Sequence, residues 1–196
     1  MTPLAAQVQA VFDEVDRVTS AFATASGIAC TAGCGACCHS PNVEASELEM
    51  LPMAEHLLET GEAEALHQHL KEHPGDKTCV FFKPVPGSST DGRCGRYLQR
   101  PLVCRLFGFA GRRNKEGRPQ FNACKIHQQA IPSAVRDTII RVDQGTLRPP
   151  LFSEAMDAVW AIHPTLGFDR FPINEALRKA LERVLFSRQY EERQQD

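Results

Sequence analysis

The stretch "CTAGCGACCH", residues 30–39, places four cysteines and one histidine within ten positions. Two of these cysteines are adjacent, and Gly33 and Gly35 stand between the others. Thiol clusters of this density occur in disulfide frameworks, in metal sites and in redox centres. The residues on either side of the stretch help to distinguish these three interpretations and define the fold around it.

The amino-terminal residues lack the features of a secretory signal. Asp13, Asp16 and Arg17 interrupt the apolar residues, there is no basic opening segment, and no stretch reaches the roughly 18 consecutive apolar residues of a membrane span. We therefore expect a cytoplasmic protein, mature as written, with no membrane partner. Disulfides are rare in a reducing compartment, so this location favours metal binding or redox chemistry unless an export signal has been removed.

The segments that flank the cysteines show helical periodicity. Residues 3–25 are predicted to form an amphipathic helix, with apolar positions at Leu4, Val8, Val11, Phe12, Val15, Val18 and Phe22. Ser46 and Glu49 have the spacing of a capping box, and Pro52 predicts a kink or a restart in the helix that follows. A short helix is expected over 62–72, and residues 129–193 are predicted to be helical.

The centre of the chain has a different composition. Residues 84–97 are rich in Pro, Gly and Ser and are predicted to form a loop. The segments "CVFF" (79–82) and "RLFGFAG" (105–111) are candidates for short strands. The sequence thus predicts a mainly α protein with at most short strands, formed by a single domain over 1–196. A loop-rich, cysteine-bearing metal-binding core over 28–128 is enclosed by helices over 3–25 and 129–193.

All the cysteines lie between the first and the last predicted helices, mostly in irregular segments and several of them near glycines. They are Cys30, Cys34, Cys37, Cys38, Cys79, Cys94, Cys104 and Cys124. This distribution disfavours a role in core packing alone, because glycine lets the backbone pass close to a ligated centre. A closed zinc site and a cubane iron–sulfur cluster each take four ligands, so eight thiols suit two sites, or one site with additional reactive thiols. His39 and His127 are further nitrogen donors, and we expect both to be structural.

The spacing of the thiols favours a polynuclear centre. Structural zinc modules present two separated Cys pairs, whereas here four cysteines are compressed into nine residues and the others stand singly. The spacing Cys30-x3-Cys34-x2-Cys37 also matches the loop of radical S-adenosylmethionine enzymes. The repeated strand–helix units of those enzymes have no counterpart in this sequence, so we reject that fold.

Basic residues surround two of the cysteines. Residues 93–118 carry eight basic residues and one acidic residue, whereas residues 1–72 carry eleven acidic and two basic residues. Within "GRCGRYLQRPLVCRLF" (92–107), Arg93, Arg96, Arg100 and Arg105 stand beside Cys94 and Cys104. Arginine can neutralise thiolates or hold an anionic substrate, and a solvated basic face is the alternative. A nucleic-acid partner is not expected, because the net charge of the whole chain is −2.

Together these motifs resemble the YkgJ-like cysteine-cluster family of zinc- or iron-chelating domains. The pattern comprises a cysteine-rich opening, a Cys-Pro-Phe-like stretch, Cys-x-x-Tyr, Arg-Pro-x-x-Cys-Arg and a closing cysteine. It falls here on Cys30, Cys34, Cys37, Cys38, Cys79, Cys94, Tyr97, Arg100, Pro101, Cys104, Arg105 and Cys124. Val80 replaces the proline that follows the first single cysteine, which leaves the ligand itself unchanged. The resemblance covers about residues 28–128.

The resemblance implies an iron–sulfur or zinc protein, and many members have no assigned reaction. A flagellin lysine-methylating enzyme looks related through a similar cluster, so a protein substrate is conceivable. The sequence itself does not decide whether the protein is an enzyme. It contains no nucleophile elbow, phosphate loop or glycine fingerprint.

We therefore expect a metalloprotein that binds an iron–sulfur centre of the 4Fe-4S type through its eight cysteines, with redox or protein-modifying activity. In this interpretation Arg100 and Arg105 donate hydrogen bonds to the centre and Tyr97 packs over it. The first alternative is a zinc-stabilised binding or scaffold module without catalysis. The second is a metal buffer or trafficking protein, for which His67, His69 and His73 are additional donors. The expected partners are a metal ion or cluster and a protein partner or substrate.

Overall fold

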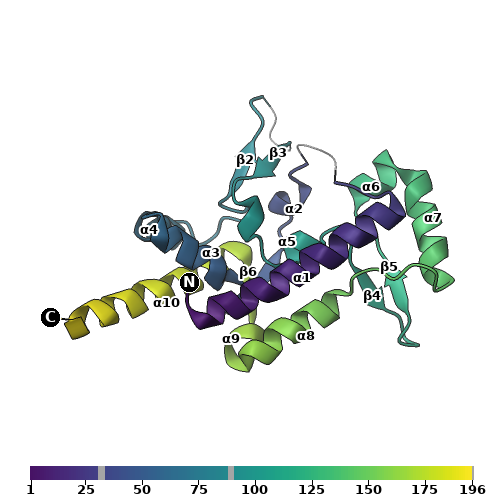
Figure 1. Cartoon of the computed structure of the whole chain (residues 1–196). Helices are drawn as coiled ribbons and strands as arrows, with labels where there is room; N and C mark the ends of the chain where they lie inside the picture. The colour runs from purple at the N-terminus through teal and green to yellow at the C-terminus, as the bar shows by residue number, and fades with distance from the viewer. Residues whose placement is uncertain (31–33, 88–90, 196) are drawn as a thin grey trace.

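The structure of the chain is a computed structural model, and it describes residues 1–30, 34–87 and 91–195. Within these ranges the protein is mainly α, as predicted, with ten α-helices, one 3-10 turn and three short antiparallel strand pairs. The long helix α1 crosses the molecule, and the β2–β3 hairpin projects on the opposite side from α8 and α9 (Figure 1). In the same described part of the chain, no helix is long and apolar enough to cross a membrane.

Helix α1, Pro3–Ser26, closely follows the predicted amphipathic helix. The side chain of Thr2 caps its amino terminus by accepting a hydrogen bond from the backbone N–H of Ala5, and Pro3 occupies the first helical position. Gly27 ends the helix in the left-handed conformation at φ 71°, which an L residue with a side chain adopts at a cost. Helix α1 therefore ends at a defined position, shortly before Cys30.

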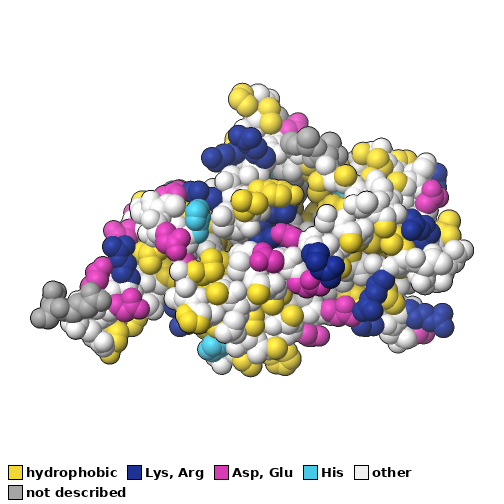
Figure 2. Space-filling view, viewed as in Figure 1, with side chains coloured by type: hydrophobic (Ala, Val, Ile, Leu, Met, Phe, Trp, Pro, Cys, Tyr) yellow, Lys and Arg dark blue, Asp and Glu magenta, His cyan; other side chains and the backbone are white. Residues whose placement is uncertain are grey.

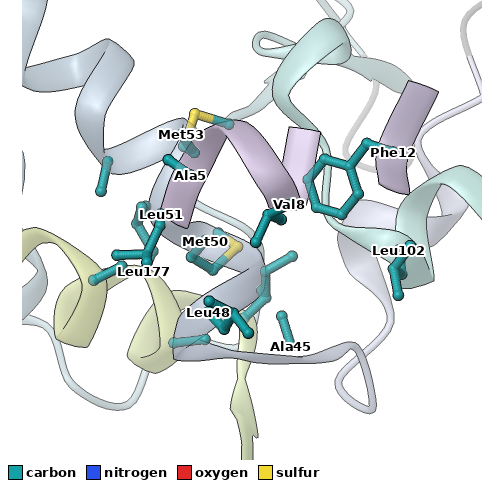
Figure 3. Close-up of a cluster of buried hydrophobic side chains, with 14 of the residues drawn as sticks. Ala5, Val8, Phe12, Ala45, Leu48, Met50, Leu51, Met53, Leu102 and Leu177 are labelled. Atoms are coloured by element: carbon teal, nitrogen blue, oxygen red, sulfur yellow. The ribbon is translucent and has the colours of Figure 1, made fainter. Parts of the chain in front are cut away.

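The main hydrophobic core is centred on α3 (Glu47–Glu59), which contacts α1, α4 (Ala63–Glu72) and α10 (Ile173–Gln195). Figure 3 shows apolar side chains of α1, α3 and α10 pointing toward one another, among them Val8, Leu51 and Leu177. All three are almost completely buried. The core also includes Cys38 and Cys79, so it supports one side of the cavity described below.

The predicted capping box at the start of α3 is confirmed. Ser46 Oγ accepts the Glu49 N–H, and the Glu49 carboxylate accepts the Ser46 N–H at 2.8 Å. The helix runs from Glu47 to Glu59 as one element through Pro52, so the expected restart does not occur. Glu49 is buried and also accepts the backbone N–H of Leu102 at 3.2 Å and pairs with Arg170 at 3.0 Å, which links α3 to two distant segments.

The remaining helices surround the other side of the cysteine-bearing segment. They are α2 (Ala36–His39), α5 (Leu102–Leu106), α6 (Lys125–Ala130), α7 (Pro132–Asp143), α8 (Phe152–Ile162) and α9 (Pro164–Phe168). A second, smaller core joins the end of α1 to α7 and includes Phe22, Ile28, Phe121 and Val135. The rings of Phe22 and Phe121 lie 5.2 Å apart. This smaller core fixes α1 beside the segment that leads to Cys124.

Each strand pair consists of two three-residue antiparallel strands. The pairs are β1 (Glu44–Ser46) with β6 (Arg170–Pro172), β2 (Phe82–Pro84) with β3 (Gly92–Cys94), and β4 (Gly111–Arg113) with β5 (Pro119–Phe121). Only Phe82 of the predicted strand 79–82 lies in a strand. Of the strand predicted over 105–111, only Gly111 lies in a strand. Pro101 caps the short helix α5 (Leu102–Leu106), and Gly108 then turns the chain at φ 83°.

Candidate metal centre

All eight cysteines line one cavity of about 240 Å³. The cavity lies among the β2–β3 hairpin, α2, α5 and α6, which the ribbon places together above α1 (Figure 1). Cys37 and Cys38 lie on α2, Cys94 on β3 and Cys104 on α5, while Cys124 is the capping residue of α6. All eight are free thiols. Residues remote in sequence thus converge on one space.

Backbone hydrogen bonds position the thiols of α2 and the hairpin. The Cys79 N–H donates to the Cys38 carbonyl at 3.0 Å, which holds the turn before β2 against α2. Cys94 is paired with Phe82 across the hairpin. A side chain at Gly92 would place its Cβ 2.4 Å from the Phe82 ring, so the close approach of the two strands requires glycine there. Gly92, two residues before Cys94, therefore allows the close backbone approach that the sequence predicted.

Four of the thiols, Cys37, Cys38, Cys79 and Cys94, form a group that we call the thiol quartet. The Cys38 side chain shares hydrogen bonds with the sulfurs of the other three, and these bonds raise the pKa of Cys38. The same bonds lower the pKa of Cys37 to about 7 and that of Cys94 to about 6, and they also lower the pKa of Cys79. The quartet therefore holds thiolate character near neutral pH.

The other thiols have different surroundings. Burial raises the pKa of Cys30, and the neighbouring thiols of Cys124 and Cys34 raise it further. Burial also raises the pKa of Cys104 well above its ordinary value, and Cys37 adds to this effect. The Cys124 sulfur accepts the backbone N–H of His127 at 3.4 Å. Cys37 of the quartet also raises the pKa of Cys30, so the thiols outside the quartet lie within electrostatic reach of it in the same cavity.

Three arginines reach the cavity wall: Arg93, Arg96 and Arg100. Arg100 donates from Nε to the Tyr97 carbonyl at 2.8 Å and from Nη1 to the Cys104 carbonyl at 3.2 Å, and it stacks on the Tyr97 ring at 3.4 Å. The Arg100 charge favours the thiolate forms of Cys37 and Cys94. Tyr97 and Arg100, two of the three non-cysteine residues predicted for the centre, therefore line the cavity.

Arg105, the third of these residues, does not line the cavity. Its buried guanidinium pairs with Asp16 of α1, donates to the backbone carbonyls of Leu98 and Arg100, and lies 4.5 Å from the centroid of the Phe12 ring. Burial lowers its pKa, and the Asp16 carboxylate opposes that effect. The expected hydrogen bond from Arg105 to the centre is therefore replaced by contacts that hold the surrounding backbone.

His127 lines the cavity although it is expected from the sequence to be structural. The side chain is almost completely buried, its Nδ1 lies 3.2 Å from the Gly108 carbonyl, and burial lowers its pKa. The spacing Cys124-x2-His127 on one helical turn is the signal that connects it with the cysteines. His39 does not line this cavity and packs edge-on against Phe82 at 4.1 Å.

The histidines of the metal-buffer hypothesis do not line the thiol cavity. The rings of His69 and His73 stack at 4.4 Å, and the His73 Nδ1 bonds to the His69 carbonyl at 2.9 Å. His69 and His73 line a separate cavity, which Cys79 also borders. The Nε2 atom of His67 is buried without a hydrogen-bond partner among the described residues. These histidines therefore do not extend the ring of eight thiols.

The donor atoms of the cavity fit a zinc ion or an iron–sulfur cluster in kind and in number. Thiolates are the preferred ligands of both, and each takes four. Within residues 1–30, 34–87 and 91–195, no group of three or more His, Cys, Asp or Glu side chains is already arranged to hold a metal ion. The backbone nevertheless brings all eight thiols to one cavity, where rotation of the side chains can bring their sulfurs to a metal.

A helical frame around a cavity lined by cysteines defines a metal-binding, cysteine-cluster protein. Residues 29–148, more than half of the chain, match the CxxCxxCC family model, described as a "Putative zinc- or iron-chelating domain". The chain belongs to this family. The match confirms the resemblance to a cysteine-cluster family and extends through α7, beyond the predicted limit at 128. No curated protein and no solved structure matches the chain.

Proposed function

We propose that the protein binds an iron–sulfur cluster of the 4Fe-4S type in the thiol-lined cavity and uses it for redox or protein-modifying chemistry. The observation that carries the proposal is the convergence of eight free thiols on one cavity of about 240 Å³. A water molecule occupies about 30 Å³ in the liquid, so this space exceeds what one ion requires. A cluster of several irons and sulfides would use both the volume and the number of donors.

The residues around the cavity have separate tasks in this proposal. When bound, the cluster supplies electron transfer. Cysteine thiolates hold it, and the charge of Arg100 offsets part of their negative charge. Tyr97 and Arg100 form part of the wall near the exposed surface, where a protein partner or substrate would approach. Residues 28–128 are the metal-binding core in this proposal.

A specific observation favours zinc as the second candidate. The Cys38 thiol lies close enough to Cys37, Cys79 and Cys94 for hydrogen bonding to shift its pKa, so these four thiols are the natural donor set for a single ion. Four thiolates around zinc would order α2 and the β2–β3 hairpin without catalysing a reaction. This is the zinc-stabilised binding module, in which metal binding and local folding are coupled.

Anaerobic purification of the full chain, followed by iron, zinc and acid-labile sulfide analysis, tests both candidates. The iron–sulfur proposal expects visible absorbance and about four irons and four sulfides per chain, the content of one cubane cluster. Stoichiometric zinc without iron or sulfide would instead support the zinc module. Protein that contains neither metal would contradict both proposals.

Variants of two thiols then separate the sites. Replacement of Cys37 by Ser removes a quartet member, whereas replacement of Cys104 by Ser removes a thiol outside the quartet. Metal binding that uses thiols both inside and outside the quartet predicts lower metal content in both variants. A zinc ion in the quartet predicts loss only with Cys37→Ser. Unchanged metal content in both variants would mean that the ligands are assigned incorrectly.

A further inference from the structure

His127 and Cys124 form a donor pair on one side of the cavity. Both line the cavity. Cys124 caps α6, His127 lies in its first turn, and the Cys124 sulfur accepts the His127 N–H at 3.4 Å. Gly108 packs against both residues, because a Cβ placed there would lie 2.9 Å from His127 Cε1 and 3.3 Å from Cys124 Sγ. The imidazole and the thiol are therefore held beside each other by the same turn.

The hydrogen bond of His127 fixes which ring nitrogen can bind a metal. The Gly108 carbonyl is only an acceptor, so Nδ1, 3.2 Å away, carries the proton. In the neutral ring Nε2 then has a free lone pair. Among the described residues Nε2 has no hydrogen-bond partner, although the side chain is almost completely buried. Histidines that bind metals commonly donate their second nitrogen to a backbone carbonyl in this way.

The quartet does not include this pair. The hydrogen bonds of Cys38 join Cys37, Cys79 and Cys94. Of the eight thiols that line the cavity, Cys30, Cys34, Cys104 and Cys124 therefore lie outside the quartet. Cys124, Cys34 and Cys37 all raise the pKa of Cys30, so the two sets of thiols are neighbours in one cavity.

We propose that Nε2 of His127 and the thiolate of Cys124 bind one metal ion in the cavity, outside the thiol quartet, with the remaining ligands drawn from Cys30, Cys34 and Cys104 to give a three-thiolate, one-imidazole centre. This inference rests on the proposed function, because it requires that the cavity binds metal. Such a donor set is one of the common tetrahedral sites of zinc. A thiophilic divalent ion is the chemical class of ligand that this set would take. The thiol quartet remains available for a separate centre.

Cadmium provides a direct test, because it binds thiolates and imidazoles and its spin-active isotope couples to the protons of a bound imidazole. The full chain is stripped of metal under reducing, anaerobic conditions and loaded with cadmium-113 alone. We expect about two Cd²⁺ per chain, one in the thiol quartet and one at His127 and Cys124, and a scalar coupling between the second cadmium and the His127 ring protons. Bound cadmium without this coupling, or no bound cadmium, would overturn the inference.

Two variants and a control separate ligation from structural effects. His127→Gln should reduce binding to about one Cd²⁺ per chain, while His127→Cys should retain about two and lose the ring coupling. The control is His39→Gln, which changes a histidine that also follows a cysteine but lies outside the cavity, and it should change neither result. Retention of both ions by His127→Gln would contradict the inference. If the variants do not fold, the coupling in the wild-type protein decides.

Failure of this inference is distinguishable from failure of the proposed function. Iron and sulfide in the protein as purified, together with cadmium-loaded protein that lacks the His127 coupling, would leave the proposed function intact and remove only His127. The opposite combination of results also separates the two claims. A His127 coupling in a protein that carries zinc but no iron or sulfide as purified would support the ligand and contradict the iron–sulfur cluster.

Discussion

Gly108 sits at a point where both its conformation and its neighbours require the absence of a side chain. Its φ is 83°, and the nearest atoms to a new Cβ would belong to His127 and Cys124. Gly145 has a similar φ of 72°, but nothing lies within 4 Å of the corresponding position. The two glycines therefore share the conformational cost of substitution and differ in the steric one.

Gly108→Ala should destabilise the protein by about 2–5 kcal/mol, from left-handed strain and overpacking together, and it should lower the metal content. Gly145→Ala should cost about 1–2 kcal/mol and leave the metal content unchanged. Urea unfolding and metal analysis of the two purified variants measure both effects. Equal losses of stability and equal metal content would show that the contact with His127 and Cys124 is unimportant.

The pKa of Cys94 near 6 predicts an unusually reactive thiol in the metal-free protein. A pKa below the ordinary value means that the thiolate fraction is high at pH 7 and falls as the pH drops through about 6. Alkylation of Cys94 by iodoacetamide, followed by peptide mass spectrometry, should therefore be half-maximal near pH 6. Cys104, whose pKa is raised well above its ordinary value, should remain unmodified at pH 7.

Cys38 is the principal cause of this shift, so it provides the control. Cys38→Ala removes the hydrogen bond to the Cys94 sulfur and should move the half-maximal pH of Cys94 alkylation upward. The same shift also affects stability. A lowered pKa stabilises the metal-free fold above pH 9, and this stabilisation is lost as the pH falls through about 6. An unchanged profile in Cys38→Ala would contradict the role of the quartet.

Arg105 of α5 is a buried charge that connects α5 to α1 and to the segment that precedes α5. Its guanidinium binds Asp16 of α1 and two carbonyls of the segment that precedes α5, while its side chain is 1% exposed. The Asp16 side chain is 49% exposed. Water can therefore solvate the carboxylate if its partner is removed, but it cannot solvate the guanidinium.

This asymmetry predicts that loss of the acid is worse than loss of the base. Asp16→Asn should cost about 3 kcal/mol because it leaves a buried charge without its counter-ion, whereas Arg105→Met should cost about 1–2 kcal/mol through two unpaired carbonyls. Arg17→Ala, which breaks an exposed pair with Glu14 on the same helix, should change stability by less than about 0.5 kcal/mol. Thermal or urea unfolding ranks the three variants, and the reverse order for Asp16 and Arg105 would contradict the argument.

The helices could be predicted from the sequence because their signals are local. Apolar spacing, the Thr2 and Ser46 caps and Gly27 lie within the elements that they define. The β1–β6 pair had no such signal, because it joins Glu44 to Pro172 across most of the chain. The pairing depends on tertiary packing rather than on strand propensity.

The candidate site shows the same division between local and long-range information. The convergence of the eight cysteines could be predicted from their type and spacing, and all eight line the cavity. The partners of Arg105 were not readable, because Asp16 lies 89 positions away in sequence on another helix. Which thiols lie next to which also depends on the fold, as the quartet of α2, the turn before β2, and β3 illustrates.

The charge imbalance along the chain is largely resolved by the fold. The basic central segment contacts the acidic amino-terminal segment through Arg96 with Glu62 and Arg105 with Asp16. Arg113 similarly pairs with Glu154. Figure 2 shows Lys and Arg side chains interspersed with Asp and Glu side chains on the visible face. Several arginines of the basic segment therefore serve internal ion pairs.

Removal of the metal should affect the two halves of the molecule differently. The main core of α1, α3, α4 and α10 contains most of the large buried side chains, whereas α2, β2, β3 and α5 are short elements around the thiols. Because short elements gain little stability from their own hydrogen bonds, their order should depend on the bound metal. Ligand at about 100 times its dissociation constant contributes about 2.7 kcal/mol of stability.

Chelation should therefore lower the unfolding midpoint and remove hydrogen-exchange protection from residues 34–40 and 79–106, while α1, α3 and α10 keep theirs. Far-UV circular dichroism should change little, because the long helices supply most of the signal. Exchange mass spectrometry of the metal-bound and chelated protein measures the difference segment by segment. Cys37→Ser without chelator should reproduce the chelated pattern. Uniform loss of protection along the chain would mean that the helical core also depends on metal, and unchanged protection around the thiols would mean that the cavity is ordered without it.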